Sequence, residues 1–418
     1  MATNQTQREK LLDLTIAAVA KQGLDGTSLR AIAADAGAST TAIFQNYSGK
    51  SELISDALRA AIDRDTVFHD DLRSQIFGLV RSHLGFADLV ATYIELRATS
   101  DHARFLTEIF VSAQDYAHCL AALRDWHHKR QQFWADLIAA QNLPAQSAGI
   151  IGDYVLMEEF YAHALSGQVQ YRLLLRETAR ALCQSAFTGG LPDLAESSVS
   201  LALGVTPLSV RGPAVGNDHA VARHLLDAAV EIINQAGVSG INQRAIARAV
   251  GVSTSIITYH FNDMKTFVTQ AIWQALVQGI PVQLNPEHEN EQQPSDLQEW
   301  LGILDQLLQP RQADRPAGYY VGFSRLTGEA CLMAKRNPAL LPLIVYLRGL
   351  EGWGTYRVSQ AIPSLANRIG RDQAAAFGVW IKAEAMLRST GLHEDSSNGV
   401  ARLNTAADYI FPLGTSEQ

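Results

Sequence analysis

The fold is decided by a stretch that occurs twice in the chain. Residues 23–53 read GLDGTSLRAIAADAGASTTAIFQNYSGKSEL, and residues 237–267 read GVSGINQRAIARAVGVSTSIITYHFNDMKTF. The wider window of residues 8–58 aligns onto residues 222–272 without a gap and with 14 identities in 51 pairs. Because self-similarity at one fixed offset marks a repeated structural unit, the chain is predicted to consist of two related halves in tandem.

Each copy of the stretch predicts three short helices. Apolar residues recur at helical spacing in residues 9–22, and Gly23 follows as a helix stop. Ser28 is an N-cap for a short helix that ends at Gly37, and Ser39 is an N-cap for a third helix. The same roles recur in the second copy at Asn242, Gly251 and Ser253. Two short helices joined by a tight glycine-containing turn, packed on a preceding helix, form a helix-turn-helix.

The duplicated stretch resembles the DNA-binding signature of TetR-type, tetracycline-repressor-like transcription regulators, over about a quarter of the chain. The resemblance implies an all-α protein of two tandem units. Each unit has an N-terminal three-helix helix-turn-helix domain and then a helical domain for effector binding and dimerisation. The expected boundaries are 1–60 and 61–203 for the two domains of the first unit, 204–217 for a linker, and 218–275 and 276–418 for the second unit.

The remaining segments fit this plan. Residues 204–217 hold three glycines and two prolines, as a linker does, and the polar residues 282–296 predict a loop. No alternation typical of β-strands occurs over a convincing length. Helices are predicted at residues 86–99, 102–117, 119–141, 148–187 and 192–203 in the first half, and at 297–309, 316–335, 338–361 and 371–390 in the second.

The resemblance assigns a set of DNA-contacting residues to each copy. Lys50 matches the family's phosphate-binding lysine, and Arg30 matches a base- or backbone-contacting position on the preceding helix. Gln45 and Asn46 carry amides that can pair with adenine in the major groove. The full set is Arg30, Thr40, Thr41, Ala42, Phe44, Gln45, Asn46 and Lys50 in the first copy, and Arg244, Thr254, Ser255, Ile256, Thr258, Tyr259, His260 and Lys265 in the second.

The copies depart from the family pattern and from each other. The family usually places a phosphate-contacting tyrosine where Phe44 and Thr258 stand, and Met264 replaces the phosphate-binding lysine. Lys and Arg number five against six Asp and Glu in residues 1–58, and four against three in residues 219–275. We therefore expect contacts that depend on hydroxyls and helix dipoles. Two unlike recognition helices suit an asymmetric operator. The alternative is that, in either copy, these residues are merely polar surface residues and do not bind DNA.

Aromatic residues crowd both helical regions. At helical spacing they form either plain core or the walls of a ligand pocket, and an aromatic lining favours an apolar or aromatic effector. Glu158 lies on an apolar stripe of its helix, so its carboxylate either has a buried partner or reaches water at an edge. The candidate effector-binding residues are Phe105, Phe110, Trp134, Tyr154, Glu158, Tyr320, Phe323, Trp353 and Trp380.

Composition excludes several classes of protein. The 34 Lys and Arg against 42 Asp and Glu give a net charge of −8, which excludes a histone-like, globally basic nucleic-acid binder. No apolar run approaches the roughly 20 residues of a membrane span, and the first ten residues lack the apolar core of a signal peptide. We therefore expect no membrane partner and a cytoplasmic location. Three scattered cysteines without CxxC spacing predict neither a disulfide framework nor a cysteine-based metal site.

No catalytic residue, metal or cofactor is expected. Glu159 and His163 lie one helical turn apart, but no HExxH, paired ExxH or CxxC motif accompanies them. No nucleophile elbow, phosphate loop or dinucleotide fingerprint occurs either. A helical enzyme therefore remains only as an alternative.

The expected function is transcription regulation, with the protein acting as a repressor. By resemblance, a small organic effector releases the chain from double-stranded operator DNA, and both helix-turn-helix units pair inside one chain as a pseudodimer. The alternatives are a chain-to-chain dimer with four such units, and a ligand-binding partner protein in which one or both DNA-binding units are degenerate.

Overall fold

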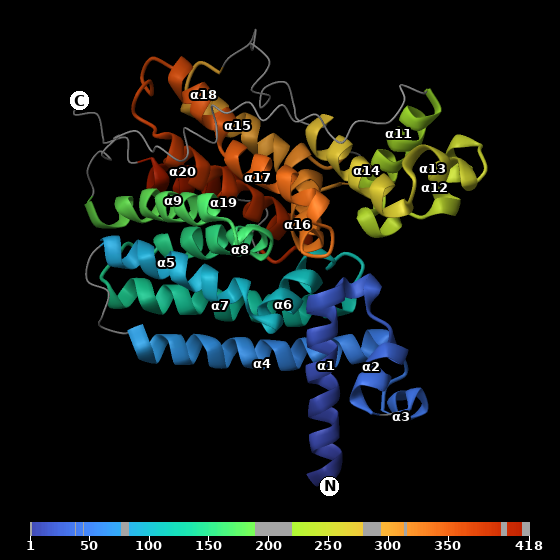
Figure 1. The fold of residues 1–418 in the computed structure, drawn as a ribbon. Coiled ribbons are helices and arrows are strands. Elements are labelled where there is room, and N and C mark those ends of the chain that lie inside the picture. Colours follow the sequence, from blue (N-terminus) through green and yellow to red (C-terminus); the bar gives the residue numbers. More distant parts are fainter. Residues whose placement is uncertain are drawn as a thin grey trace. The chain divides into compact units, whose positions relative to one another are not determined.

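The computed structural model describes residues 2–37, 39–44, 46–76, 83–188, 220–278, 294–312, 316–393 and 399–411. Throughout these ranges the regular elements are helices and none is a strand (Figure 1), which confirms the predicted all-α class. The linker 204–217, the predicted helix 192–203 and most of the loop 282–296 lie outside the described residues. No helix within the described ranges is both long and apolar enough to cross a membrane.

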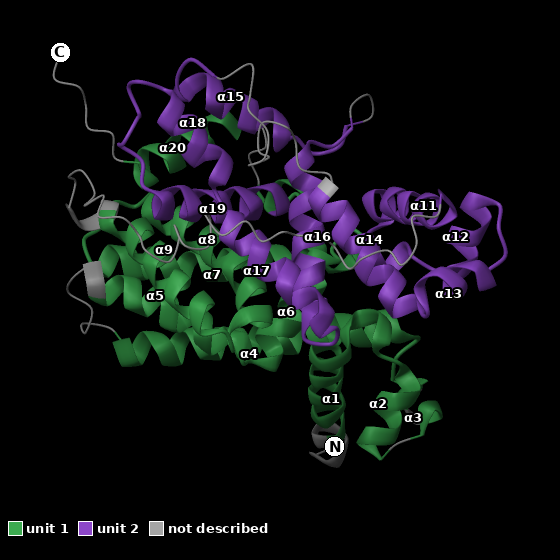
Figure 2. Cartoon of the chain, turned by 45° about the horizontal axis from the view of Figure 1, so that its top comes forward, with its two compact units in different colours: residues 1–192, 387–418 green, residues 193–386 purple. Residues whose placement is uncertain are grey.

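The chain divides into two compact units (Figure 2). Unit 1 comprises Met1–Pro192 and Leu387–Gln418, and unit 2 comprises Asp193–Met386. The predicted second helical domain, residues 276–418, is thus divided between the units. Its last part groups with unit 1 although no linker composition marks the boundary, because the boundary falls inside one helix, α19 (Arg371–Thr390).

Unit 1 begins with the three-helix domain that the sequence predicts. Helix α1 (Ala2–Gly26) packs on α2 (Leu29–Ala36) and α4 (Lys50–Ile76), and the short α3 (Thr40–Phe44) packs on α2. The backbone at Gly23 is not helical (φ 75°), so α1 is interrupted at the predicted stop. The apolar side chains that recur along α1 are buried, namely Leu12, Ile16 and Val19.

The helical part of unit 1 is a bundle built on α4 (Figure 1). Helix α4 packs on α6 and α7, α7 packs on α8, and α5 packs along both α8 and α9. Most of the side chains buried between these helices are apolar and form a continuous core. The bounds are α5 (His83–Ala98), α6 (Asp101–Val111), the 3-10 helix η1 (Ala117–Cys119), α7 (Leu120–Ala140), α8 (Ser147–Leu165) and α9 (Val169–Thr188).

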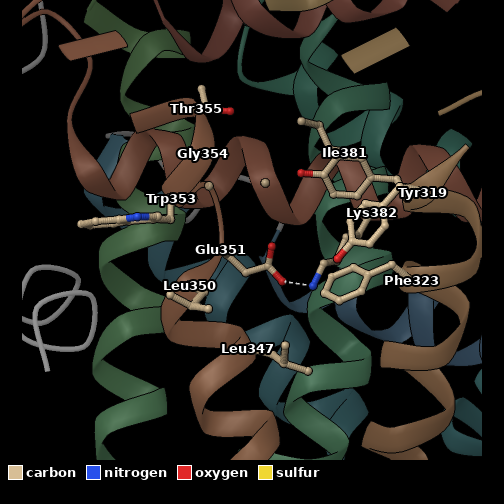
Figure 3. A pocket seen from close by; sticks show the side chains of 13 residues that line it. Tyr319, Phe323, Leu347, Leu350, Glu351, Trp353, Gly354, Thr355, Ile381 and Lys382 are labelled. Carbon is tan, nitrogen blue, oxygen red and sulfur yellow. Dashed lines mark hydrogen bonds and ion pairs between the residues drawn. The ribbon is translucent and has the colours of Figure 1, made fainter. Parts of the chain in front are cut away.

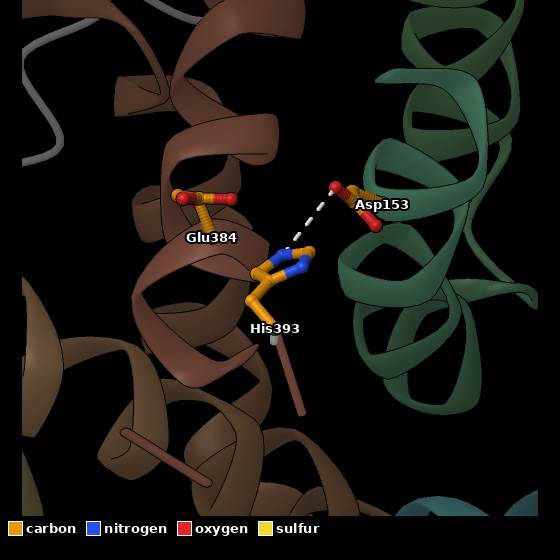
Figure 4. Close-up of side chains that lie close together, drawn as sticks. All are labelled: Asp153, Glu384 and His393. Atoms are coloured by element: carbon orange, nitrogen blue, oxygen red, sulfur yellow. Dashed lines mark ion pairs between the residues drawn. The ribbon is translucent and has the colours of Figure 1, made fainter. Parts of the chain in front are cut away.

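The C-terminal segment returns to unit 1. Helix α20 (Gly399–Ile410) packs on α9. Its Arg402 places Nη2 2.7 Å from Oδ2 of Asp153, a fully buried carboxylate on α8. His393, before α20, turns its ring to the same oxygen, with Nε2 at 3.8 Å (Figure 4). The segment that contains His393 and α20 therefore brings a positive charge to a buried carboxylate of unit 1.

Unit 2 repeats the plan. Helix α11 (Ala220–Ala236) packs on α12 (Gln243–Val250) and α14 (Met264–Gln278), and α13 (Ser255–Phe261) packs on α14. Helix α14 in turn packs on α16, which contacts α15 and α17. The remaining bounds are the 3-10 helix η2 (Val238–Gly240), α15 (Leu297–Leu307), α16 (Tyr319–Ala334), the 3-10 helix η4 (Pro338–Leu340), α17 (Leu341–Leu350) and α18 (Trp353–Ala361).

Two predicted helices are wrong because each is two helices. The segment 148–187 is interrupted between α8 and α9 by a turn at residues 166–168 that contains Gly167. The segment 338–361 is interrupted between α17 and α18 at Gly352, whose φ of 70° is left-handed. A third prediction, 102–117, is too long, since α6 ends at Val111. Each break carries polar or glycine residues (112–116, 166–168 and 351–352), a local signal that hydrophobic spacing alone does not weigh.

Candidate nucleic-acid interface

The first helix-turn-helix is fixed by its caps and its core. Ser28 Oγ accepts a hydrogen bond from the Ala31 backbone N–H at 3.2 Å and so caps α2 as predicted. Gly37 ends α2 at φ 69°, a left-handed conformation that glycine adopts without strain. Ile32 and Ile43 are buried. The apolar sides of α2 and α3 are therefore held inward, and their polar sides face solvent.

The second helix-turn-helix is fixed in the same way. Asn242 Oδ1 accepts the Ala245 backbone N–H at 2.9 Å, and Gly251 ends α12 at φ 75°. Ile246 and Ile257, which align with the two buried isoleucines of the first copy, are buried as well. The sequence register of the repeat is thus also its structural register.

One predicted cap in the second copy is wrong. Ser253 does not cap α13, because Thr254 occupies the N-cap position and makes no side-chain capping bond. The Ser253 hydroxyl instead lies 2.8 Å from the Ser255 hydroxyl. This pairing leaves a cluster of hydroxyls exposed at the start of α13.

The first copy exposes four of its eight predicted DNA-contacting residues. Arg30, Thr41 and Asn46 are exposed, Thr40 is half-buried, and the ring of Phe44 is 55% exposed. Gln45 lies outside the described residues, as does the side chain of Ala42.

The second copy exposes a different set. Arg244, Thr258 and Lys265 are exposed, as are the hydroxyl residues Thr254 and Ser255, whereas Ile256 and His260 are half-buried. The ring of Tyr259 is 77% exposed and meets His260 edge-on, with the ring centroids 5.1 Å apart. The two recognition helices therefore present unlike chemistry on a shared scaffold.

Comparison with known families agrees with this geometry. The family described as bacterial regulatory proteins, tetR family, matches residues 11–57 and residues 225–271, which are the two helix-turn-helix segments. Both segments are tetR-family DNA-binding domains. The protein is accordingly a DNA-binding transcriptional regulator with two such domains in tandem. A search of curated proteins finds no match to the chain.

Lys50 is engaged inside the first tetR-family domain. Its ammonium donates to the Leu24 carbonyl at 2.5 Å, and burial lowers its pKa. In the second domain Met264 takes this position and Lys265, one residue later, is exposed. Lys50 thus ties the start of α4 to the end of α1, just beyond the interruption at Gly23.

Sequence reasoning missed two features of these domains. Arg248 is exposed on α12, one turn beyond Arg244, and its signal was a second basic residue at helical spacing. Tyr47 is buried, and its hydroxyl donates to Asp56 Oδ2 at 3.1 Å. The same oxygen pairs with Arg8 at 2.6 Å. This tyrosine therefore fixes α4 against α1 and is not available for DNA.

A pocket in the helical part of unit 2 collects three of the predicted effector-binding residues. Tyr320, Phe323 and Trp353 line about 530 Å³ of space that is partly open to solvent (Figure 3). The fourth, Trp380, is buried and stacks on Phe377 with the ring centroids 5.8 Å apart. The remaining lining residues are Tyr319, Leu347, Leu350, Glu351, Gly352, Gly354, Thr355, Gly378, Ile381 and Lys382.

The polar part of this pocket is a buried ion pair. Lys382 Nζ lies 2.5 Å from Glu351 Oε1 and 4.5 Å from the centre of the Phe323 ring (Figure 3). Arg371 donates to the backbone carbonyls of Glu351 at 2.5 Å and Gly349 at 2.6 Å, which fixes the loop that carries the carboxylate. Both partners of the pair are therefore held in place by the protein.

In unit 1 the predicted effector-binding residues lie in a packed interior. Phe105, Phe110, Trp134, Tyr154 and Glu158 are fully buried. The Trp134 ring packs on Tyr93 at 5.1 Å, and the Tyr154 hydroxyl lies 2.8 Å from the Thr178 hydroxyl.

Four helices of unit 1 share a buried ionic cluster. Arg97 on α5 pairs with Asp65 on α4 and, at 2.7 Å, with Glu159 on α8. Arg130 on α7 pairs with the same Glu159 oxygen at 2.7 Å. His163 lies one helical turn from Glu159, and its Nε2 is 3.2 Å from the Thr107 hydroxyl. Glu159 is thus committed to two arginines that join the helices.

Proposed function

We propose that this chain is a ligand-responsive repressor, and that its two tetR-family domains read one asymmetric operator. The observation that carries the proposal is the pair of recognition helices, which share caps, glycines and buried isoleucines but expose different side chains. Two identical recognition helices select a symmetric operator, whereas two unlike recognition helices select two different half-sites. A single chain would then bind an asymmetric operator in one orientation.

Coupling of a ligand to DNA is supported by α16. Tyr320 and Phe323, near its N-terminus, line the pocket. Farther along the helix, Glu329 Oε2 accepts the backbone N–H of Val238 at 2.9 Å, in the turn that precedes α12. This single helix, about 24 Å long at 1.5 Å per residue, thus contacts both the pocket and the second DNA-binding domain.

A second bond supports the same coupling. Asn337, just after α16, donates from Nδ2 to the Thr269 hydroxyl on α14 at 2.6 Å, and both side chains are buried. A ligand that moves α16 would therefore move α11, α12 and α14 with it. Release of DNA requires that the ligand bind the non-DNA conformation more tightly, and operator DNA must then weaken ligand binding by the same factor.

Pairing of the two units within one chain completes the proposal. Relatives of this type read two half-sites with two domains, and this chain carries both. The segments 148–187 and 371–390 are the ones proposed to pair. Intramolecular pairing would make half-site occupancy independent of protein concentration.

The DNA-reading proposal is tested with variants of each recognition helix. The operator is first selected as the genomic fragments that the purified protein retains. Q45A/N46A and, separately, Y259A/H260A are each expected to cost about 1–3 kcal/mol of specific binding, because each removes base- or phosphate-contacting groups. Equilibrium titration of labelled operator at fixed salt concentration measures this cost.

The matched control is N234A/Q235A, which removes two exposed polar side chains of α11 outside the recognition helix. It is expected to bind like the unmodified chain. If one recognition-helix variant also binds like the unmodified chain, that domain is only a scaffold. If neither variant loses affinity, the DNA-reading assignment is wrong.

A further inference from the structure

The pocket of unit 2 combines aromatic walls with a charge pair that is already neutral. Tyr319, Tyr320, Phe323 and Trp353 are half-buried around it, and the rings of Tyr319 and Phe323 stack with centroids 4.9 Å apart. Lys382 and Glu351, by contrast, are buried. The walls offer flat apolar surface to a ligand, and the pair offers one polar anchor.

The ion pair restricts the charge of a ligand. Because ammonium and carboxylate are only 2.5 Å apart, their fields largely cancel at a third group. Lys382 and Glu351 are the charged residues among those that line the pocket, so a ligand with a net charge would lose its hydration without meeting a lining charge outside this pair, and burying such a charge is costly. The free-energy cost of desolvation is much smaller for a neutral polar group that enters this site.

A hydroxyl group matches both members of the pair. It accepts a hydrogen bond from an ammonium and donates one to a carboxylate at the same time. Charge-assisted hydrogen bonds of this kind are stronger than neutral ones.

From these observations we propose that the effector site takes an uncharged aromatic alcohol of the phenol or naphthol class. The ring system lies among Tyr319, Tyr320, Phe323 and Trp353, and the hydroxyl binds the Lys382–Glu351 pair. The inference rests on the proposed function only in calling the ligand an effector. The binding chemistry stands on the pocket itself.

The test uses three probes of similar shape and different charge. Isothermal titration calorimetry of the full chain without DNA compares 2-naphthol, 2-naphthoate and 2-naphthylmethylammonium. The chain is expected to bind 2-naphthol at least about tenfold more tightly than either ion, a difference of about 1.4 kcal/mol. Equal or tighter binding of an ion, or no binding of 2-naphthol up to millimolar concentration, would overturn the proposal.

A charge variant sharpens the test. Glu351→Gln keeps the shape of the side chain but leaves the Lys382 charge uncompensated, so the preference is expected to move toward 2-naphthoate by about tenfold or more. Glu231→Gln, an exposed residue of α11, is the control and keeps the original preference. An unchanged preference in folded Glu351→Gln contradicts the role of the pair. Phe323→Leu keeps both charges and is expected to weaken the binding of 2-naphthol. This variant replaces Glu351→Gln in the test if Glu351→Gln does not fold.

The experiment separates this inference from the proposed function. If 2-naphthol binds with the expected charge preference but leaves operator affinity unchanged, the ligand class stands and ligand-responsive repression is wrong. If operator binding is specific but no probe binds, the DNA-reading proposal stands and the ligand class is wrong.

Discussion

At the residue scale, His69 is a buried histidine of unit 1 whose hydrogen bonds suit the neutral ring. Its Nδ1–H donates to the Asp65 carbonyl at 2.6 Å, and its Nε2 accepts from the Tyr93 hydroxyl at 2.8 Å, so the neutral ring is fully bonded. Burial lowers its pKa to about 4, and although the Asp65 carboxylate favours the charged ring, the positive charges of Arg97 and Arg130 oppose it. Protonation would therefore break a satisfied arrangement.

The expected consequence is acid sensitivity with a defined sign. The folded pKa is about 4 and the unfolded value is about 6.5, so the unfolded chain binds more protons between these values and stability falls as pH decreases through that window. His69→Gln removes this proton difference, and a flatter dependence of the unfolding free energy on pH is expected. Urea unfolding at several pH values measures it, with exposed His224→Gln as the control. An unchanged slope in His69→Gln would refute the assignment.

At the scale of elements, the junction between α17 and α18 depends on one glycine. Gly352 has φ 70°, and a Cβ there would lie 1.7 Å from the Ala374 carbonyl oxygen on α19. An alanine at this position would carry both left-handed strain and a backbone clash. The close approach also sets the pocket, because Gly352 and the neighbouring Glu351 both line it.

Gly352→Ala is therefore expected to destabilise unit 2 by more than about 2 kcal/mol, since left-handed strain alone costs about 1–2 kcal/mol. The matched control is Gly322→Ala on α16, where a Cβ meets nothing within 4 Å. The control is expected to be neutral or stabilising by up to about 1 kcal/mol, because alanine is the better helix former. Thermal unfolding of both variants makes the comparison. Equal midpoints would show that the junction tolerates a side chain.

The elements that the sequence predicted well are those with local signals. Ser28, Gly37, Asn242 and Gly251 take the predicted capping and stop roles, because caps and left-handed glycines act within a few residues of themselves. The Lys382–Glu351 pair could not be predicted, since 31 positions separate its members and only the approach of the junction between α17 and α18 to α19 brings them together. Aromatic character alone points to Tyr320, Phe323 and Trp353, and it does not distinguish them from the buried Trp380.

At the scale of the whole molecule, the chain is more than two repeats in series. The duplicated DNA-binding domains follow the sequence repeat, but residues 387–418 belong to unit 1, where Arg402 pairs with Asp153 at 2.7 Å. No local pattern in residues 276–418 marks that division, because α19 runs through it without a break. Completion of unit 1 thus requires the C-terminal end of the chain.

We propose that one chain, with its two unlike DNA-binding domains, binds one operator without a second chain. Sedimentation equilibrium of the chain at micromolar concentration, alone and with its selected operator, tests it most directly. We expect a free species of 45.5 kDa and a complex that contains one chain per operator. A stable free species of twice 45.5 kDa, or two chains on each minimal operator, would contradict it.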